Sequence, residues 1–142
     1  SDPRTVRISP ENLAKIKADN AGWILSKVAE IPEAFFITRK DQQDNPLGRT
    51  LEHFSGEMYI QSLSSMLPVK ILAPELDDKI LDMCAAPGSK TTFLSQKMEN
   101  TGLLVCNEPS GSRSKKLSAN LNRLGVINSV MLQSDGVKMY HF

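Results

Sequence analysis

The amino-acid sequence predicts an α/β domain with a Rossmann-like parallel sheet, preceded by a small α+β unit. Two observations carry this prediction. In the second half of the chain, short apolar runs of strand length alternate with segments of helical periodicity, the pattern of βαβ units. The first of these runs enters the turn Pro87-Gly88 and then a helix, as in α/β proteins that hold a cofactor. Because the chain ends soon after the third such strand, we expect only part of the sheet.

The predicted α+β unit spans residues 1–46. Its helix begins at Ser9-Pro10-Glu11, where an N-cap residue, a proline and an early acid stand together, and it ends near residues 20–22. The flanking apolar and β-branched runs predict strands at residues 4–8, 23–28 and 34–38. Residues 40–49 are polar and rich in turn formers, so we expect a linker there.

The predicted cofactor domain spans residues 47–142. Its strands are expected at residues 58–60, 79–83, 103–106 and 130–132. A helix should begin near Ser62, and Pro68 should kink or end it. Two more helices follow the turn and the second parallel strand. We expect them to bury Phe93, Leu94, Met98, Leu117, Leu121 and Leu124, and the second to stop at Gly125.

Two acids follow the parallel strands at informative positions. Glu108 lies twenty residues after Gly88, where nucleotide-binding folds place a carboxylate on ribose hydroxyls, and Asp135 follows the next strand. Acids at two successive strand ends suit a ribose and an adenine amino group better than a phosphate. The pattern therefore points to S-adenosylmethionine. An Asp-Gly pair is also a common turn, so a turn role for Asp135 stays open.

The turn itself supplies the other expected contacts. The backbone N–H groups of Ala86 to Ser89, at a helix N-terminus, can receive the carboxylate of the methionine moiety, and Gly88 would let the ligand approach without a Cβ in the way. Lys90 could add a positive charge, or it could be a solvated lysine. An ordinary strand-to-helix turn is the structural alternative for Pro87-Gly88.

The sequence around the turn excludes two other classes of cofactor site. A Walker-type loop ending at Lys90-Thr91 would need glycine where this chain has Cys84 and Ser89. A dinucleotide fingerprint would need three spaced glycines, yet Gly88 is the only glycine between Gly56 and Gly102. Neither a P-loop nor an NAD site is expected.

Composition describes an ordinary globular chain. It has 142 residues, 40% hydrophobic and 23% charged, with a formal net charge of +1. No apolar run approaches the length of a membrane span, so we expect no membrane association and a cytosolic protein, or a nuclear or nucleolar one in a eukaryote. The two cysteines, Cys84 and Cys106, lack metal-site spacing, and we expect both to fill small core positions and no metal to bind.

Two linked blocks resemble a known family. The segment Met58 to Pro68 and the segment Asp82-Met83-Cys84-Ala85-Ala86-Pro87-Gly88-Ser89-Lys90-Thr91 are similar to the NOL1/NOP2/Sun family of RNA cytosine-5 methyltransferases, and closest to its bacterial subgroup acting on 16S ribosomal RNA. The likeness continues through Asn107-Glu108 and Ser112-Arg113 to Asp135-Gly136.

The resemblance implies a site and a reaction. It implies S-adenosylmethionine binding by Cys84, Ala85, Ala86, Pro87, Gly88, Ser89, Lys90, Glu108, Arg113 and Asp135. Bracing of Glu108 is the alternative role for Arg113. It implies methyl transfer to carbon 5 of a cytosine in ribosomal or transfer RNA, through a cysteine nucleophile and a second cysteine. It also implies an RNA-binding role for the N-terminal unit.

The blocks that hold the two catalytic cysteines in this family do not occur in these 142 residues. We therefore expect neither Cys84 nor Cys106 to be catalytic, and this chain alone to be inactive. The alternative is a non-catalytic module that binds S-adenosylmethionine or RNA. The helix after Ser110 carries basic residues that could meet RNA phosphates or could form a solvated face.

Overall fold

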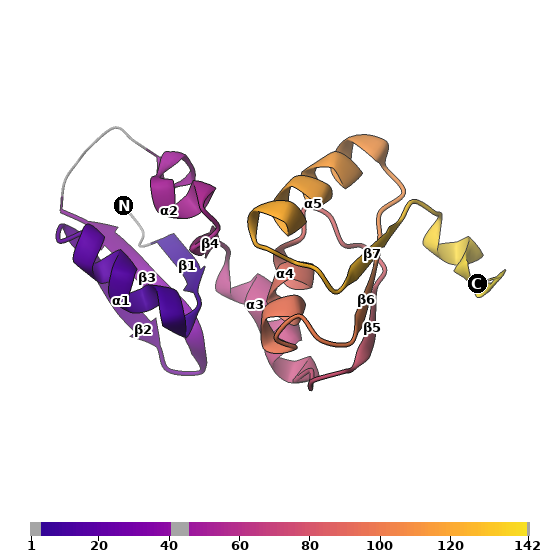
Figure 1. The fold of residues 1–142 in the computed structure, drawn as a ribbon, viewed down its shortest axis with the longest axis horizontal. Helices are drawn as coiled ribbons and strands as arrows, with labels where there is room; N and C mark the ends of the chain where they lie inside the picture. Colours follow the sequence, from indigo (N-terminus) through magenta and orange to yellow (C-terminus); the bar gives the residue numbers. More distant parts are fainter. Residues whose placement is uncertain (1–3, 41–45, 142) are drawn as a thin grey trace. The chain divides into compact units, whose positions relative to one another are not determined.

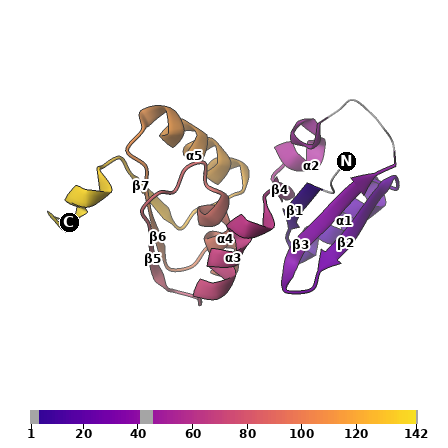
Figure 2. The same cartoon turned by 180° about the vertical axis from the view of Figure 1, so that it is seen from behind.

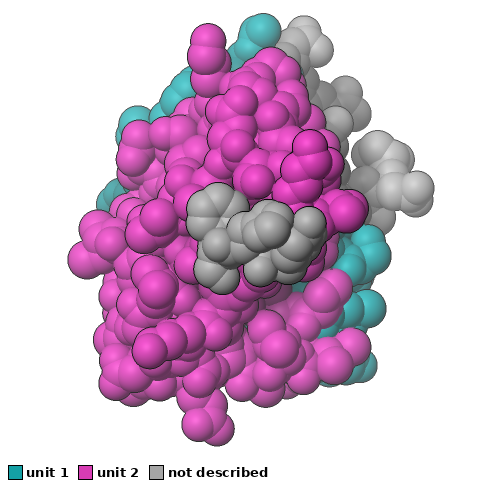
Figure 3. Space-filling model, turned by 90° about the vertical axis from the view of Figure 1, so that its right-hand side faces the viewer, with its two compact units in different colours: residues 1–67 teal, residues 68–142 magenta. Residues whose placement is uncertain are grey.

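A computed structural model describes residues 4–40 and 46–141 and divides the chain into two compact units (Figures 1 and 3). The first unit spans Ser1–Leu67 and the second spans Pro68–Phe142. The division therefore falls later in the chain than the boundary after residue 46 that the linker composition predicts. Residues 41–45 of that predicted linker lie outside the described residues.

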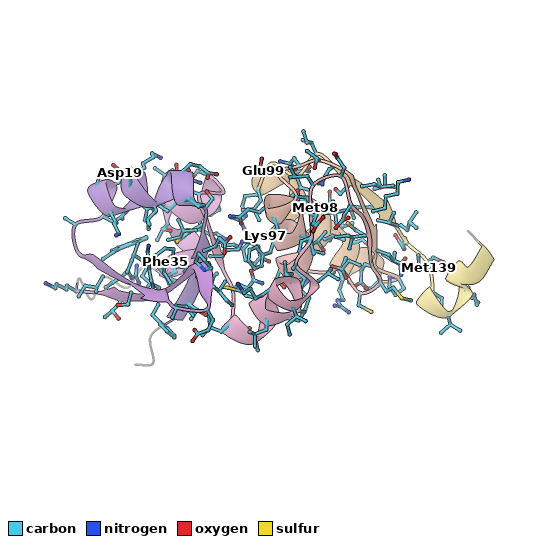
Figure 4. The ribbon with its side chains drawn as sticks, turned by 90° about the horizontal axis from the view of Figure 1, so that it is seen from below. Asp19, Phe35, Lys97, Met98, Glu99 and Met139 are labelled. Atoms are coloured by element: carbon cyan, nitrogen blue, oxygen red, sulfur yellow. The ribbon has the colours of Figure 1, made fainter. Side chains whose placement is uncertain are left out.

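The first unit is an antiparallel sheet with helix α1 (Pro10–Asp19). The strand order is β2-β3-β1-β4, formed by β1 (Arg4–Ile8), β2 (Trp23–Val28), β3 (Ile31–Arg39) and β4 (Met58–Ile60). These elements confirm the predicted strands and the predicted helix. Apolar side chains from α1 and the sheet build the core, among them Ile16, Met58 and Phe35, which is labelled in Figure 4.

The later boundary has a physical cause in the pairing of β4. This strand lies antiparallel to β1, with Val6 opposite Ile60 and Ile8 opposite Met58. The segment before it, formed by η1 (Leu47–Arg49) and α2 (Leu51–Phe54), adds the buried Leu47 to the same core. Residues 47–60 complete the first sheet, which composition around the linker could not indicate.

Helix α3 (Leu63–Leu72) confirms the predicted helix near Ser62 and overturns one of the two alternatives given for Pro68, that the helix ends there. The helix does not end there, since it continues through Pro68 to Leu72. A proline removes one backbone donor and crowds the preceding turn, but the helix has apolar residues on both sides of it, and Met66 and Val69 are buried. Burial of these side chains outweighs the local preference to stop.

The second unit is a parallel sheet in the order β5-β6-β7. Its strands are β5 (Lys79–Asp82), β6 (Leu103–Asn107) and β7 (Ser129–Leu132), linked by α4 (Ser89–Lys97) and α5 (Gly111–Arg123) and followed by η2 (Gly136–His141). Both linking helices lie on the same face of the sheet (Figures 1 and 2). The predicted α/β class with a partial Rossmann-like parallel sheet is confirmed.

Side chains on the helix-covered face form the core of the second unit. Of the residues expected in the core, Leu124 is only partly buried. The others are buried, together with Leu104 and Cys106 of β6: Phe93, Leu94, Met98 (labelled in Figure 4), Leu117 and Leu121. The other face of the sheet carries Leu81 and Val130, each about half exposed at 48% and 49%. Throughout the part of the chain that the structure describes, no helix combines the length and the apolar character that crossing a bilayer requires.

Candidate functional site

The predicted site residues converge on the carboxyl edge of the parallel sheet. Asp82 pairs with Cys106, which pairs with Met131, so β5, β6 and β7 end at the same level. The Pro87-Gly88 turn, Glu108 and Asp135 each follow one of these ends. This is the edge at which open α/β sheets bind ligands.

Asp82 holds the turn to the helix that follows it. One carboxylate oxygen, Oδ1, accepts the Cys84 N–H at 3.3 Å, and Oδ2 accepts the Thr91 hydroxyl at 2.7 Å. The turn closes on itself through the Gly88 N–H, which donates to the Ala85 carbonyl at 2.7 Å. A single side chain at the end of β5 thus ties both sides of the turn.

The backbone conformation at Gly88 gives this glycine a structural role besides the one expected from the sequence. Its φ of 104° and ψ of 9° lie in the left-handed region that favours glycine. A Cβ built there would meet Leu117 Cδ1 at 3.1 Å and Asn120 Cβ at 3.6 Å, both on α5. The missing side chain therefore makes room for α5, a neighbouring helix of the protein, and the expected approach of a ligand to Gly88 stays a prediction.

The set of amide donors is also narrower than the expected range from Ala86 to Ser89. Pro87 has no N–H, the Ala86–Pro87 bond is cis, and the Gly88 N–H is used inside the turn. The helical donors of this region are the first-turn N–H groups of α4, from Ser89 onward, since the first residues of a helix lack an intrahelical acceptor. Lys90 is exposed beside them.

Glu108 is buried and held in place by its neighbours. It is 1% exposed, its Oε1 accepts the Ser110 N–H at 3.0 Å, and its Oε2 lies 3.4 Å from Arg113 Nη2. The same Arg113 nitrogen donates to the Ala86 carbonyl at 2.8 Å. Arg113 therefore braces Glu108, as expected, and also joins it to the turn.

Asp135 is exposed and ordered by the turn that follows it. Its Oδ1 accepts the Val137 N–H at 3.1 Å, and its backbone carbonyl accepts the Lys138 N–H at 2.8 Å. These bonds are those of an Asp-led turn, the alternative that the sequence left open. The carboxylate nevertheless lies at the same sheet edge as Glu108.

The two cysteines differ from each other, which corrects one expectation. Cys106 is buried on the helix-covered face of β6, as expected, whereas Cys84 is exposed in the turn. Burial, with a smaller contribution from the nearby negative charge of Asp82, raises the pKa of the Cys106 thiol to about 12. Cys106 is thus a neutral core thiol, and Cys84 does not fill a core position.

Three side chains that the sequence did not assign to the site hold the segments at this edge together. They are Asp82, Asn107 and Asn120, whose Nδ2 donates to the Pro87 carbonyl at 2.8 Å. Asp82 and Asn107 each end an apolar strand with a polar residue, a signal the sequence does carry. Asn120 lies in the last turn of α5, where the helical pattern gives no sign of its contact with the turn.

Comparison with known proteins gives concordant matches. The family described as 16S rRNA methyltransferase RsmB/F matches residues 69–142. The ribosomal RNA small subunit methyltransferase F of Citrobacter koseri is 44% identical over 134 residues, and that of Vibrio parahaemolyticus is 46% identical over 134 residues. Each match covers 93% of this chain and 28% of the relative, so the chain spans little more than a quarter of their length.

Solved structures share the fold. A methyltransferase homolog protein from Pyrococcus horikoshii superposes with a TM-score of 0.85 at 32% identity, covering 99% of this chain and 47% of that one. NSun6 from Pyrococcus horikoshii with SFG has the same TM-score at 21% identity, covering 99% of this chain and 60% of that one. The family match covers just over half of the residues of this chain. The chain therefore belongs to the 16S rRNA methyltransferase RsmB/F family, and the resemblance seen in its sequence is confirmed.

Proposed function

We propose that the natural protein containing this chain transfers a methyl group from S-adenosylmethionine to carbon 5 of a cytosine in RNA, and that this chain supplies the cofactor-binding half. The observation that carries the proposal is the convergence of Glu108, Asp135 and the first turn of α4 at one edge of a parallel sheet. Membership in the RsmB/F family supports it.

The residues at this edge match the chemistry of the cofactor. S-adenosylmethionine, when bound, supplies the methyl group. The N-terminal end of α4 suits its carboxylate, because the positive end of the helix dipole favours negative charge there. Glu108 suits the ribose hydroxyls and Asp135 the adenine amino group, since both carboxylates are acceptors. Arg113 would hold Glu108 beside the turn, through its contact with Oε2 and its bond to the Ala86 carbonyl.

Ribosomal RNA is the favoured substrate. The curated relatives are named ribosomal RNA small subunit methyltransferases and come from bacteria, which supports a bacterial cytoplasmic protein rather than a nucleolar one. In this chain, Lys115 and Lys116 are exposed on α5 and could contact phosphates. The N-terminal unit is the second proposed RNA contact.

The nucleophile of the proposed reaction lies outside this chain. Attack on the pyrimidine requires a thiolate, and the Cys106 thiol stays protonated in its buried position near neutral pH. Cys84 is exposed but lies inside the turn, beside the first-turn donors of α4. We assign the covalent step to cysteines of the longer natural protein, and expect residues 1–142 alone to transfer no methyl group.

Replacement of Glu108 by alanine tests the cofactor site. In the natural protein, Glu108→Ala should weaken S-adenosylmethionine binding by roughly 1.5–3 kcal/mol, the range for losing hydrogen bonds to a charged partner. Calorimetry measures the affinity, and the melting temperature is recorded in parallel. The control is Glu75→Ala, which removes an exposed acid from the loop before β5, at the opposite edge of the sheet. Unchanged affinity in Glu108→Ala would refute the ribose assignment.

Transfer of a labelled methyl group separates the enzyme from the non-catalytic module. The natural protein should label 16S ribosomal RNA and should form a covalent complex with RNA containing 5-fluorocytosine. Binding of S-adenosylmethionine and RNA without label transfer would favour the module.

A further inference from the structure

Asn107, the last residue of β6, has a hydrogen-bond pattern that links all three strand ends of the second unit. It is fully buried, at 0% exposure. Its Nδ2 donates to the Met83 carbonyl at 3.2 Å and to the Ser134 carbonyl at 2.9 Å. Its Oδ1 accepts the Ser134 N–H at 3.0 Å, and its backbone carbonyl accepts the Ala85 N–H at 2.9 Å.

The carboxamide is suited to this position because it both donates and accepts. Two carbonyl oxygens face its NH₂ group and one N–H faces its oxygen, so the orientation of the amide is fixed by its neighbours. Toward Ser134 it acts as an extra peptide group, extending the ladder between β6 and β7 past the end of the strands. Toward Met83 and Ala85 it holds the start of the turn.

We propose that Asn107 is a positioning residue that sets the distance between the two cofactor segments flanking Glu108. One of these segments is the turn from Met83 to Gly88, and the other is the loop that carries Asp135. Asn107 stands between them and directly before Glu108, so its bonds fix both segments relative to that carboxylate. The inference rests on the proposed cofactor role of this edge.

The structure offers a matched control at the opposite edge of the same sheet. Asn128 is also buried, at 9% exposure. Its Nδ2 donates to the Thr101 carbonyl at 2.6 Å and its Oδ1 accepts the Ser95 hydroxyl at 2.8 Å. Asn128 therefore joins two segments by hydrogen bonds, as Asn107 does, but at the edge where the parallel strands begin. Glu108 lies at the edge where they end.

The test compares Asn107→Asp with Asn128→Asp in the natural protein. An aspartate at 107 keeps an acceptor for the Ser134 N–H but turns an oxygen toward two carbonyl oxygens, so both loops should be pushed away. Both variants should lower the melting temperature. Only Asn107→Asp should weaken S-adenosylmethionine binding, by roughly tenfold or more, as expected for a loss comparable to one charge-assisted hydrogen bond. If Asn107→Asp does not fold, Asn107→Ala is used instead, because alanine removes the hydrogen bonds without adding the repulsion.

Hydrogen exchange gives a second measurement that does not depend on the cofactor. In the Asn107 variants the amides of Ala85 and Ser134 should exchange faster, while in Asn128→Asp they should keep wild-type rates. Wild-type affinity in both Asn107 variants, or equal affinity losses at 107 and 128, would overturn the positioning role. If the wild-type protein itself does not bind S-adenosylmethionine, the proposed function fails. The exchange pattern then still decides whether Asn107 holds the two loops.

Discussion

Cys84 and Cys106 show how burial decides the chemistry of one residue type. Cys106 lies in the core and its thiol has a pKa raised to about 12, chiefly by burial. Cys84 is exposed, although the sequence places both cysteines at the ends of neighbouring strands. The difference arises because β5 ends at Asp82 and the chain then leaves the sheet, whereas β6 continues through Asn107.

The thiols should therefore react differently with an alkylating reagent. In the folded natural protein, iodoacetamide should label Cys84 rapidly and Cys106 only after unfolding, because the reagent needs an accessible thiolate. Cys84→Ala should leave the melting temperature nearly unchanged, whereas Cys106→Ala should cost about 1 kcal/mol of stability. Peptide mass mapping gives the labelled positions. Rapid labelling of Cys106 in the native state would contradict its assignment to the core.

The raised pKa of Cys106 also makes stability depend on pH. The folded state keeps this proton up to about pH 12, while the unfolded chain loses it above about pH 9. The contribution of Cys106 to stability is thus complete below about pH 9 and falls as the pH rises toward 12. Urea titrations measure the free energy of unfolding at about pH 7 and pH 10. Between these two pH values it should fall less in Cys106→Ala than in the wild-type protein.

The positions of single site residues could be predicted where these residues directly follow a predicted strand. Parallel strands end at one edge, so the acids that follow β6 and β7 had to lie near the turn after β5. The partners of Glu108, Asp82 and Asn107 could not be read in the same way. They are set by contacts such as Asn107 to Ser134, which join residues from different strands and depend on register.

At the scale of the element, α4 begins where α5 leaves room for it. Gly88 is the N-cap of α4, and a Cβ at this position would meet Leu117 and Asn120 of α5. The sequence predicted both helices and their buried leucines from periodicity. It could not show that one helix limits the side chain allowed at the start of the other, because periodicity contains no information on neighbours.

Two glycine variants separate backbone strain from this packing. Gly88→Ala and Gly125→Ala both place an alanine at positive φ, 104° and 65° respectively, and each should cost about 1–2 kcal/mol for the backbone alone. Only at Gly88 does the new Cβ meet a neighbour, since nothing lies within 4 Å of it at Gly125. Denaturant unfolding should therefore show a larger loss for Gly88→Ala. Equal losses would mean that α5 moves aside at little cost.

At the scale of the whole molecule, the division into two units depends on a short strand. β4 pairs with β1, and Met58 and Leu47 are buried in the core of the first unit. A boundary after residue 46 would remove both of these residues and expose the edge of β1. The composition of the polar segment could not indicate that the chain returns to the same sheet afterwards.

Two fragments test where the first unit ends. A fragment of residues 1–67 should keep the circular dichroism of a folded α+β unit and melt cooperatively. A fragment of residues 1–46 should not, because it lacks β4 and the buried Leu47 and Met58. Cooperative melting of the shorter fragment at the same temperature would restore the boundary that composition predicts.

The strand orders of the two sheets imply that their strands pair in a different order while the chain is being synthesised. In the second unit each strand pairs with the one made just before it, β5 with β6 and then β6 with β7. In the first unit β1 must wait for β3 on one side and for β4 on the other. Contacts of short sequence separation form faster than distant ones. The parallel sheet can therefore grow strand by strand as it leaves the ribosome, whereas the first strand made keeps an open edge until residues 58–60 emerge.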